Sequence, residues 1–266
     1  MPTKPAHADQ NLDVSIAQVR QWIAESERIA VLTGAGVSAE SGVPTFRDAQ
    51  TGFWAQFSPE EMARRAGYAA HPQRVWDWYL YRRQLIGAVG PNAGHVALAQ
   101  WQQRHPSQLT LVTQNVDGLH QRAGSSGVLC LHGNLMEDRW LHPPKPCCDL
   151  QQTDGGAPPQ CPRCGNCLRP AVVWFGENLP HAVFAQAQDA AEACGVMLVV
   201  GTSGRVYPAA GLAHLAKRTQ ARVVIINTEP SDLDDVADVL LRGPAAVLLP
   251  LLLGAPADEA LRAANL

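Results

Sequence analysis

The stretch RIAVLT at residues 28–33, followed directly by GAGVSA at residues 34–39, decides the fold class of this chain. A β-branched, apolar run that stops at a glycine is typical of a buried parallel strand that enters a tight turn. Three later runs have the same character: Leu109 to Thr113, Gly195 to Gly201 and Arg222 to Asn227. We therefore predict at least four strands of one parallel sheet.

Helical patterns alternate with these strands. They cover residues 12–27, 72–87, 92–104, 184–193 and 208–219. Strands that alternate with helices predict an α/β fold, here a Rossmann-like parallel sheet with helices on both faces.

One segment, from Glu137 to Leu168, breaks this alternation, because it is rich in Pro, Gly and Cys and has no periodicity. We expect it to form part of a smaller inserted lobe that resembles a degenerate zinc ribbon. The expected organisation is a single domain over residues 12–266. Its large lobe would comprise residues 12–50, 90–136 and 170–260, and its small lobe a helical insertion at 51–89 and the Cys/Pro-rich insertion at 137–169.

The composition excludes several classes of protein. The chain has 266 residues, of which 46% are hydrophobic, so it can bury a substantial core. A net charge of −3 provides no basic field for nucleic acid or anionic lipid. The N-terminus lacks the apolar stretch of a signal peptide, and the longest apolar run, Ala245 to Ala255, is short and broken by Pro250. We expect a soluble, cytoplasmic monomer without direct nucleic-acid or membrane contacts.

The glycine turn after the first strand suggests a dinucleotide site. Gly34, Gly36 and Ala39 fit the G-x-G-x-x-G/A spacing that lets backbone N–H groups approach a pyrophosphate, although a tight turn that binds nothing has the same signature. A dehydrogenase would place an acidic residue about 20 positions later, where this chain reads GFWAQ at 52–56. The turn instead continues into the loop at 41–48, a candidate lid over the cofactor.

Five ordered motifs resemble those of sirtuins, and the match spans roughly residues 28–250. The motifs are GAGVSAESGVPTFRD at 34–48, QNVD at 114–117, His132-Gly133, Gly201-Thr202-Ser203 and Asn227-Thr228-Glu229. The resemblance implies an NAD-dependent protein-lysine deacylase, which transfers the acyl group of a modified lysine to the ribose and releases nicotinamide and 2′-O-acyl-ADP-ribose. Its partners would be acyl-lysine proteins, and the chemistry depends mainly on positioning and on exclusion of water.

The resemblance also implies roles for individual residues. The NAD contacts would be Gly34, Ala35, Gly36, Ser38, Thr45, Phe46, Arg47, Gln114, Asn115, Asp117, Gly201, Thr202, Ser203, Asn227, Thr228, Glu229 and Ala245. His132 and Asn115 would be catalytic, with His132 as the base that takes a ribose hydroxyl proton. Asp117 would line the nicotinamide pocket, and the alternative is an Asx cap on a helix that begins near Gly118.

Most of the nine histidines are expected to be structural or solvated. This interpretation is given to His71, His95, His105 and His214. Only the His-Gly motif separates His132 from them.

The acyl group is suggested by Tyr79 and Arg82, three residues apart on a predicted helix. They match the Y-x-x-R of class III sirtuins, and a phenol beside a guanidinium suits the carboxylate of a succinyl, malonyl or glutaryl group. The alternative is that Arg82 and Arg83 are solvated helix residues while Tyr79 packs inward.

By the same resemblance, the segment from Val172 to Glu177 would pair with the substrate backbone, with Val173 and Phe175 as contacts. The alternative for this segment is an ordinary core strand.

The cysteine segment departs from the sirtuin pattern of two C-x-x-C pairs around a structural zinc. Cys161 and Cys164 form the second pair, but Trp140 and Pro143 occupy the expected first positions. Two interpretations stay open. A rearranged zinc site would combine Cys161 and Cys164 with Cys147, Cys148, Cys167 or His142, whereas a metal-free lobe would be held by Trp140 and the prolines.

Two other functions share parts of this pattern. An NAD hydrolase or ADP-ribosyltransferase would use the same NAD pocket. A non-enzymatic NAD sensor would need neither His132 nor the 172–177 segment.

Overall fold

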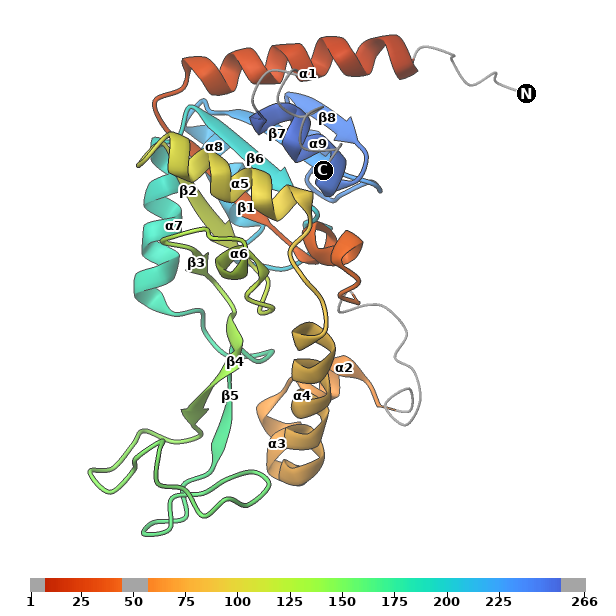
Figure 1. The fold of residues 1–266 in the computed structure, drawn as a ribbon. Coiled ribbons are helices and arrows are strands. Elements are labelled where there is room, and N and C mark those ends of the chain that lie inside the picture. Colours follow the sequence, from red (N-terminus) through yellow and green to blue (C-terminus); the bar gives the residue numbers. More distant parts are fainter. Residues whose placement is uncertain (1–7, 45–56, 255–266) are drawn as a thin grey trace.

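The computed structural model describes residues 8–44 and 57–254, which form a large part around a parallel sheet and a smaller part below it (Figure 1). The sheet order is β3-β2-β1-β6-β7-β8, and every neighbouring pair is parallel. The strands are β1 (Ile29–Thr33), β2 (Leu109–Thr113), β3 (Leu129–Cys130), β6 (Val196–Val200), β7 (Arg222–Asn227) and β8 (Val239–Arg242).

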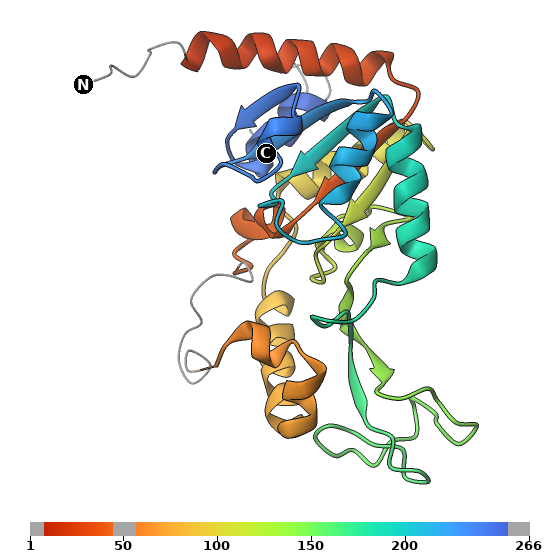
Figure 2. The same ribbon diagram turned by 180° about the vertical axis from the view of Figure 1, so that it is seen from behind.

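Alternate side chains of the strands enter two apolar layers. Ile29 and Val31 face the layer of α1 (Ala8–Glu25), α5 (Ala93–Arg104) and α9 (Ala245–Leu253). Ala30 and Leu32 face the layer of α7 (His181–Ala193) and α8 (Gly211–Arg218), which lies on the opposite side of the sheet (Figures 1 and 2). Because both faces are covered, β6 is apolar at every position and β1 at every position except its last, Thr33.

The direction in which the chain crosses the sheet reverses between β1 and β6. β1 is followed by its neighbour β2 on one side, and β6 and β7 continue on the other. Open α/β sheets bind ligands at such a switch point, beyond the carboxyl ends of the strands. The turn at Gly34 follows β1 there, and it continues as the 3₁₀ helix η1 (Ala35–Ser41).

The smaller part combines three helices with a long hairpin. The helices are α2 (Pro59–Met62), α3 (Arg65–Ala70) and α4 (Pro72–Gly87), and the hairpin pairs β4 (Gly133–Trp140) with β5 (Leu168–Val172) in antiparallel fashion. One apolar cluster, which includes Tyr68, Trp78 and Trp174, joins the helices to the hairpin.

A polar contact fastens α4 to β4. The Arg83 guanidinium donates to the Leu135 carbonyl at 2.7 Å and to Asp138 at 2.6 Å. Arg83 is therefore not the solvated residue considered above.

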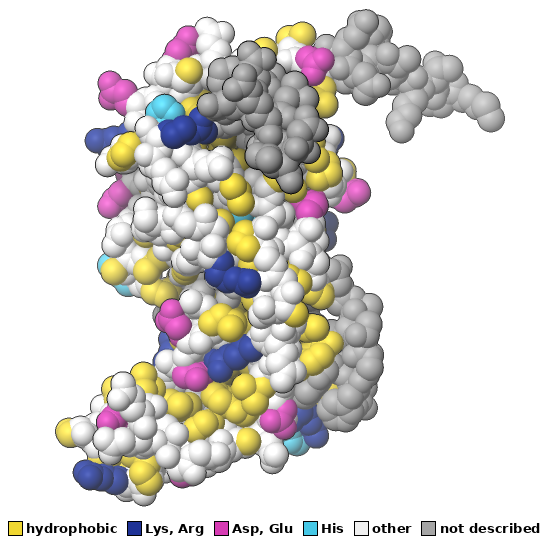
Figure 3. Space-filling view, viewed as in Figure 1, with side chains coloured by type: hydrophobic (Ala, Val, Ile, Leu, Met, Phe, Trp, Pro, Cys, Tyr) yellow, Lys and Arg dark blue, Asp and Glu magenta, His cyan; other side chains and the backbone are white. Residues whose placement is uncertain are grey.

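The four predicted strands and five predicted helices are confirmed within a few residues. The edge strand β8, the helix α9 and the β4–β5 hairpin were not predicted, whereas the short helix α6 (Leu119–Arg122) lies where a helix that begins near Gly118 was considered. Pro250, which was expected to break the apolar run from Ala245 to Ala255, lies inside α9. No helix in the described ranges is long and apolar enough to span a bilayer. On the face drawn in Figure 3, basic and acidic side chains are interspersed.

Candidate active site

Residues from separate motifs meet at the carboxyl edge of the sheet, as predicted. The amide of Gln114, after β2, donates from Nε2 to Thr202 Oγ1 at 3.2 Å. The amide of Asn227, at the end of β7, donates to the Thr202 carbonyl at 3.3 Å. The loops after β2, β6 and β7 therefore form one polar edge next to the glycine turn.

The glycines of this edge permit direct backbone contact between two loops. A Cβ added to Gly34 would lie 2.8 Å from the Gly201 carbonyl oxygen, and one added to Gly36 would lie 2.8 Å from the Gly201 Cα. Gly201 itself has φ +61°, a left-handed conformation that favours glycine. The edge thus lacks bulky side chains at the switch point, which fits the close approach of a dinucleotide pyrophosphate.

A buried hydrogen-bond network lies beneath the turn and is centred on Ser38. Its hydroxyl donates to Asp117 Oδ2 at 2.8 Å and accepts from Asn115 Nδ2 at 3.2 Å. The third partner is His95, whose Nε2 lies 3.3 Å away. One donor and two acceptor positions use the full capacity of a hydroxyl, so Ser38 fixes the positions of all three side chains.

Asp117 caps a helix and also faces the network, so the two interpretations given above are compatible. Its Oδ1 accepts from the Leu119 backbone N–H at 2.9 Å, at the start of α6, while Oδ2 accepts from Ser38. Asn115 Oδ1 has no hydrogen-bond donor among the described residues. An amide oxygen held in place by Ser38 and still open as an acceptor fits the carboxamide N–H₂ of nicotinamide.

His95 belongs to this network, so of the two roles expected from the sequence, structural or solvated, the structure shows the structural one. It is fully buried, and its Nδ1 accepts from the Asn92 backbone N–H at 3.3 Å, which leaves the proton on Nε2 for Ser38. Burial lowers the pKa of His95 to about 4, so the ring is neutral. The available signal was Asn92, three residues earlier, which forms a capping box with His95.

A second buried histidine, His120, was not singled out in the sequence. His120 Nε2 lies 2.9 Å from Thr33 Oγ1, and its ring centroid is 4.8 Å from that of His95. Burial, followed by the proximity of His95, lowers the pKa of His120 to about 3. Its Nδ1 is buried without a partner among the described residues.

His132 has the tautomer that a general base needs. Its Nδ1 lies 2.8 Å from the Gln114 carbonyl oxygen, and because a carbonyl only accepts, Nδ1 carries the proton. The Nε2 lone pair is therefore available. Burial lowers the pKa of His132, while the bond to Gln114 opposes this shift.

Tyr79 and Arg82 lie together on α4, with the phenol in the buried cluster and the guanidinium half-buried. Tyr79 accepts a 2.9 Å hydrogen bond from Trp174 Nε1, but its own hydrogen has no acceptor among the described residues. Burial lowers the pKa of Arg82, and the proximity of Tyr79 and Asp117 opposes this shift. The Arg82 guanidinium also lies over the Trp78 ring, with Cζ 5.0 Å from the ring centroid.

The segment that contains Val173 and Phe175 is bonded to its own chain. The Val173 N–H donates to the His132 carbonyl at 2.8 Å, and the Phe175 N–H donates to the Ala63 carbonyl at 2.9 Å. β5 ends at Val172, Phe175 forms an isolated parallel bridge with Arg64, and a turn closes from Trp174 to Glu177, so the segment is not a continuous strand. Phe175 is 41% exposed, and the Arg64 guanidinium lies over its ring, with Cζ 5.6 Å from the ring centroid.

The other predicted NAD contacts occupy less central positions. Ala35 begins η1, and the Ser203 carbonyl accepts from Asp232. Thr228 and Glu229 are exposed after β7, and Ala245 is buried at the start of α9, which contacts η1. Thr45, Phe46 and Arg47 lie outside the described residues.

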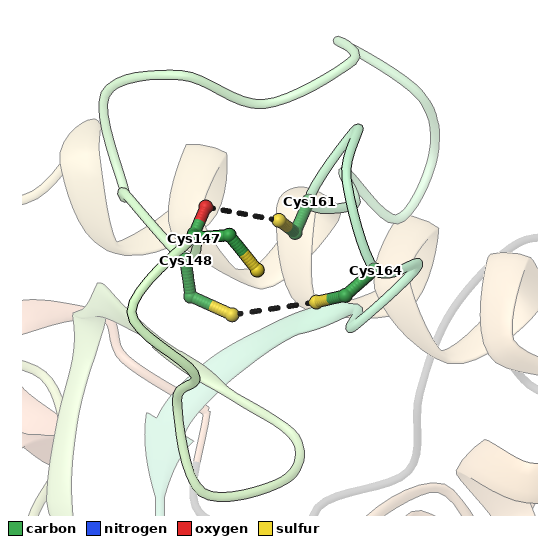
Figure 4. A group of neighbouring side chains, drawn as sticks. All are labelled: Cys147, Cys148, Cys161 and Cys164. Atoms are coloured by element: carbon green, nitrogen blue, oxygen red, sulfur yellow. Dashed lines mark hydrogen bonds between the residues drawn. The ribbon is translucent and has the colours of Figure 1, made fainter.

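The hairpin loops bring four thiols together (Figure 4). Cys147 and Cys148 come from one loop and Cys161 and Cys164 from the next, and their sulfur atoms all lie within 4.8 Å of one another. Cys148 Sγ is 3.6 Å from Cys164 Sγ, close to the roughly 3.8 Å between two thiolates on a tetrahedral zinc. The donor set of four cysteines fits zinc, and the adjacent Cys147 and Cys148 both belong to the cluster.

Neither Cys167 nor His142, the other candidate ligands, belongs to this cluster. Burial raises the pKa of the Cys161 thiol. Hydrogen bonds from the backbone of Arg163 and Cys164 outweigh burial and lower this pKa to about 7. The thiolate form that binds metal is therefore accessible at neutral pH.

Comparisons with known proteins agree with this geometry. The model of the Sir2 family matches residues 34–208. An "NAD-dependent protein deacylase" of Ralstonia nicotianae is 56% identical over 239 residues, which cover 89% of this chain and 95% of the relative. A solved Sir2 homolog–NAD complex has a TM-score of 0.79 and 37% identity, and the match covers 99% of this chain and 97% of the chain in that complex. A Sir2 protein bound to acetylated peptide has a TM-score of 0.77 and 28% identity, and the match covers 88% of this chain and 95% of that protein's chain. On the strength of the family match and of the 56% identity to its Ralstonia relative, this chain belongs to the Sir2 family.

Proposed function

We propose that this chain is an NAD-dependent protein-lysine deacylase that prefers acyl groups ending in a carboxylate, such as succinyl, malonyl and glutaryl, and also removes acetyl. The curated relatives are named for NAD-dependent protein deacylation, and family membership supports that activity here. The preference for acidic groups is argued from the residues of α4.

The polar edge would hold NAD through the residues that meet there. NAD supplies the ribose that accepts the acyl group, and nicotinamide leaves. Asn115 would accept from the nicotinamide carboxamide through Oδ1, because Ser38 fixes its Nδ2 end. The glycines at 34, 36 and 201 would let the backbone approach the pyrophosphate.

His132 would act as the general base. Its Nε2 lone pair is free while Nδ1 is committed to Gln114, and its lowered pKa keeps the ring neutral at pH 7. A neutral imidazole is able to take the proton of a ribose hydroxyl and return it later.

One observation carries the acyl preference. Among the described residues the buried Tyr79 phenol has no acceptor for its hydrogen, and Arg82 lies three residues later on the same helix, α4. An unpaired buried donor costs free energy unless a ligand satisfies it, and a carboxylate would accept the hydrogen of the phenol and attract the guanidinium charge. The methyl group of an acetyl-lysine satisfies neither.

The four-cysteine cluster would hold a structural zinc. All four ligand positions of a tetrahedral ion would be thiolates, so no position remains for a reacting molecule. The ion would tie together the two hairpin loops and contribute stability rather than chemistry.

The experiment compares kcat/KM for succinyl-lysine and acetyl-lysine peptides with wild type and Arg82→Met. Loss of the charged hydrogen bonds should lower kcat/KM for the succinyl peptide roughly 10- to 100-fold and affect the acetyl peptide much less. An equal loss for both peptides would overturn the assignment.

Arg83→Met is the matched control from the next position on α4. Arg83 is committed to Leu135 and Asp138, so its loss should lower stability without changing the ratio between the two peptides. A peptide with a succinamoyl group, neutral but of the same shape, should behave like the poorer substrate.

A further inference from the structure

Trp174 lies in the turn after β5 and is the only hydrogen-bond partner of the Tyr79 hydroxyl among the described residues. Its indole Nε1 lies 2.9 Å from the phenol oxygen, 95 residues away in sequence. An indole N–H is a donor without acceptor capacity, so the phenol must accept this bond. The hydrogen of Tyr79 must then point away from Trp174.

We propose that Trp174 is a positioning residue for acyl specificity, because it forces the Tyr79 hydroxyl to act as the donor toward the acyl group. This inference rests on the proposed function, in which Tyr79 and Arg82 bind the carboxylate. Without Trp174, the phenol could rotate its hydrogen or accept a bond from water, and its direction would no longer be fixed.

The indole itself is held on several sides. The Arg169 guanidinium lies on the ring face, with Cζ 3.2 Å from the ring centroid, and Tyr68 packs at 5.3 Å. The Trp174 backbone N–H donates to Glu177 at 2.9 Å, and Glu177 also receives two hydrogen bonds from Arg169. A side chain locked in this way presents its N–H in one direction only.

The hydrogen bond between Trp174 and Tyr79 also links two segments with different expected roles, the segment after β5 and the helix α4. Trp174 stands between Val173 and Phe175, the expected peptide contacts, while Tyr79 belongs to α4. A single hydrogen bond therefore couples the segment expected to bind the peptide backbone to the group that would read the acyl chain.

The test is Trp174→Phe, which removes the N–H and keeps an aromatic ring. Loss of one positioning hydrogen bond should lower the succinyl-to-acetyl ratio of kcat/KM about fivefold, mainly through a higher KM for the succinyl peptide. In the Tyr79→Phe background the same substitution should leave the ratio within about twofold, because the N–H acts through the phenol.

Tyr68→Phe is the matched control, because Tyr68 packs on the same indole but donates its hydroxyl to the Leu168 carbonyl at 2.6 Å. It should leave the ratio unchanged. If Trp174→Phe fails to fold, the benzothienyl analogue of tryptophan at position 174 replaces N–H by sulfur at nearly the same shape, and the same fall in the ratio is expected.

Two results overturn the inference. Either both peptides lose activity equally in the Trp174 variants, or the loss adds fully to that of Tyr79→Phe. If Arg82→Met lowers succinyl activity selectively while the Trp174 variants leave the ratio intact, only this inference fails. If Arg82→Met and Tyr79→Phe show no selectivity, the acyl preference fails, and the role of Trp174 with it.

Discussion

His132 Nδ1 and the Gln114 carbonyl oxygen are 2.8 Å apart, so Nδ1 carries the ring proton and Nε2 keeps its lone pair. The same carbonyl belongs to the residue that links β2 to Thr202. The orientation of the base and the polar edge of the sheet thus depend on one another.

The acid limb of the pH profile should lie below the ordinary histidine pKa. Burial lowers the pKa of His132, and the active form is the neutral one, so activity persists to lower pH than an exposed histidine with a pKa of about 6.5 would allow. The expected kcat/KM rises with pH through a value below about 6.5 and then levels off. His132→Ala should lose about 10²- to 10⁴-fold in activity. A limb above 6.5 would contradict the assignment.

Stability should also fall in acid. Burial lowers the pKa of His95 to about 4 and that of His120 to about 3, whereas both return to about 6.5 when the chain unfolds. The unfolded state therefore binds more protons below pH 6.5. These two residues contribute stability that is present above that pH and is lost as the pH falls toward 4.

The expected slope approaches about 2.7 kcal/mol per pH unit for two protons. Urea unfolding between pH 7 and 5 measures it, and His95→Gln should reduce the slope. A free energy of unfolding that stays constant over this range would count against two neutral, buried rings.

Gly133→Ala should destabilise the fold strongly. Gly133 has φ +81°, and an added Cβ would lie 2.0 Å from the Ala171 carbonyl oxygen across the hairpin. Gly127 is the control, because it has φ +61° but open space around it. Gly127→Ala should cost about 1–2 kcal/mol of unfolding free energy from backbone strain alone, and Gly133→Ala clearly more. Equal costs for the two substitutions would mean that the hairpin relaxes freely.

Protein purified without chelator should contain about one zinc per chain, as expected for a four-thiolate site. Cys148→Ser and Cys161→Ser should lower both the metal content and the melting temperature. Cys167→Ser should not, because Cys167 lies in the same segment but outside the cluster. A metal content near zero in the wild type would favour the metal-free lobe.

Local patterns were enough to predict the sheet and its carboxyl edge. Parallel strands end at the same side of a sheet, so the motifs that follow β1, β2, β6 and β7 had to meet, and Gln114 and Asn227 do converge on Thr202. Missed elements had weak local signals. β8 is a short edge strand with alternating exposure, and α9 contains Pro250, a residue that usually ends a helix.

Contacts between distant segments could not be predicted. Asn92 was the one local signal for His95, and the contact between His95 and Ser38 joins residues 57 positions apart. The contact between the Cys148 and Cys164 thiols depends on the path of two irregular loops between β4 and β5. The hydrogen bond between Trp174 and Tyr79 depends on how α4 packs against the hairpin. In each case the deciding contact joins residues that lie far apart in the sequence.

The most direct test of the central claim is a product analysis. Purified protein is incubated with NAD and a succinyl-lysine peptide, and the products are identified by mass spectrometry. The account predicts equal amounts of nicotinamide, deacylated peptide and succinyl-ADP-ribose, and loss of all three with His132→Ala. Free ADP-ribose with an intact peptide would indicate a hydrolase, and the absence of nicotinamide release would indicate a binding module, and either result would contradict the account.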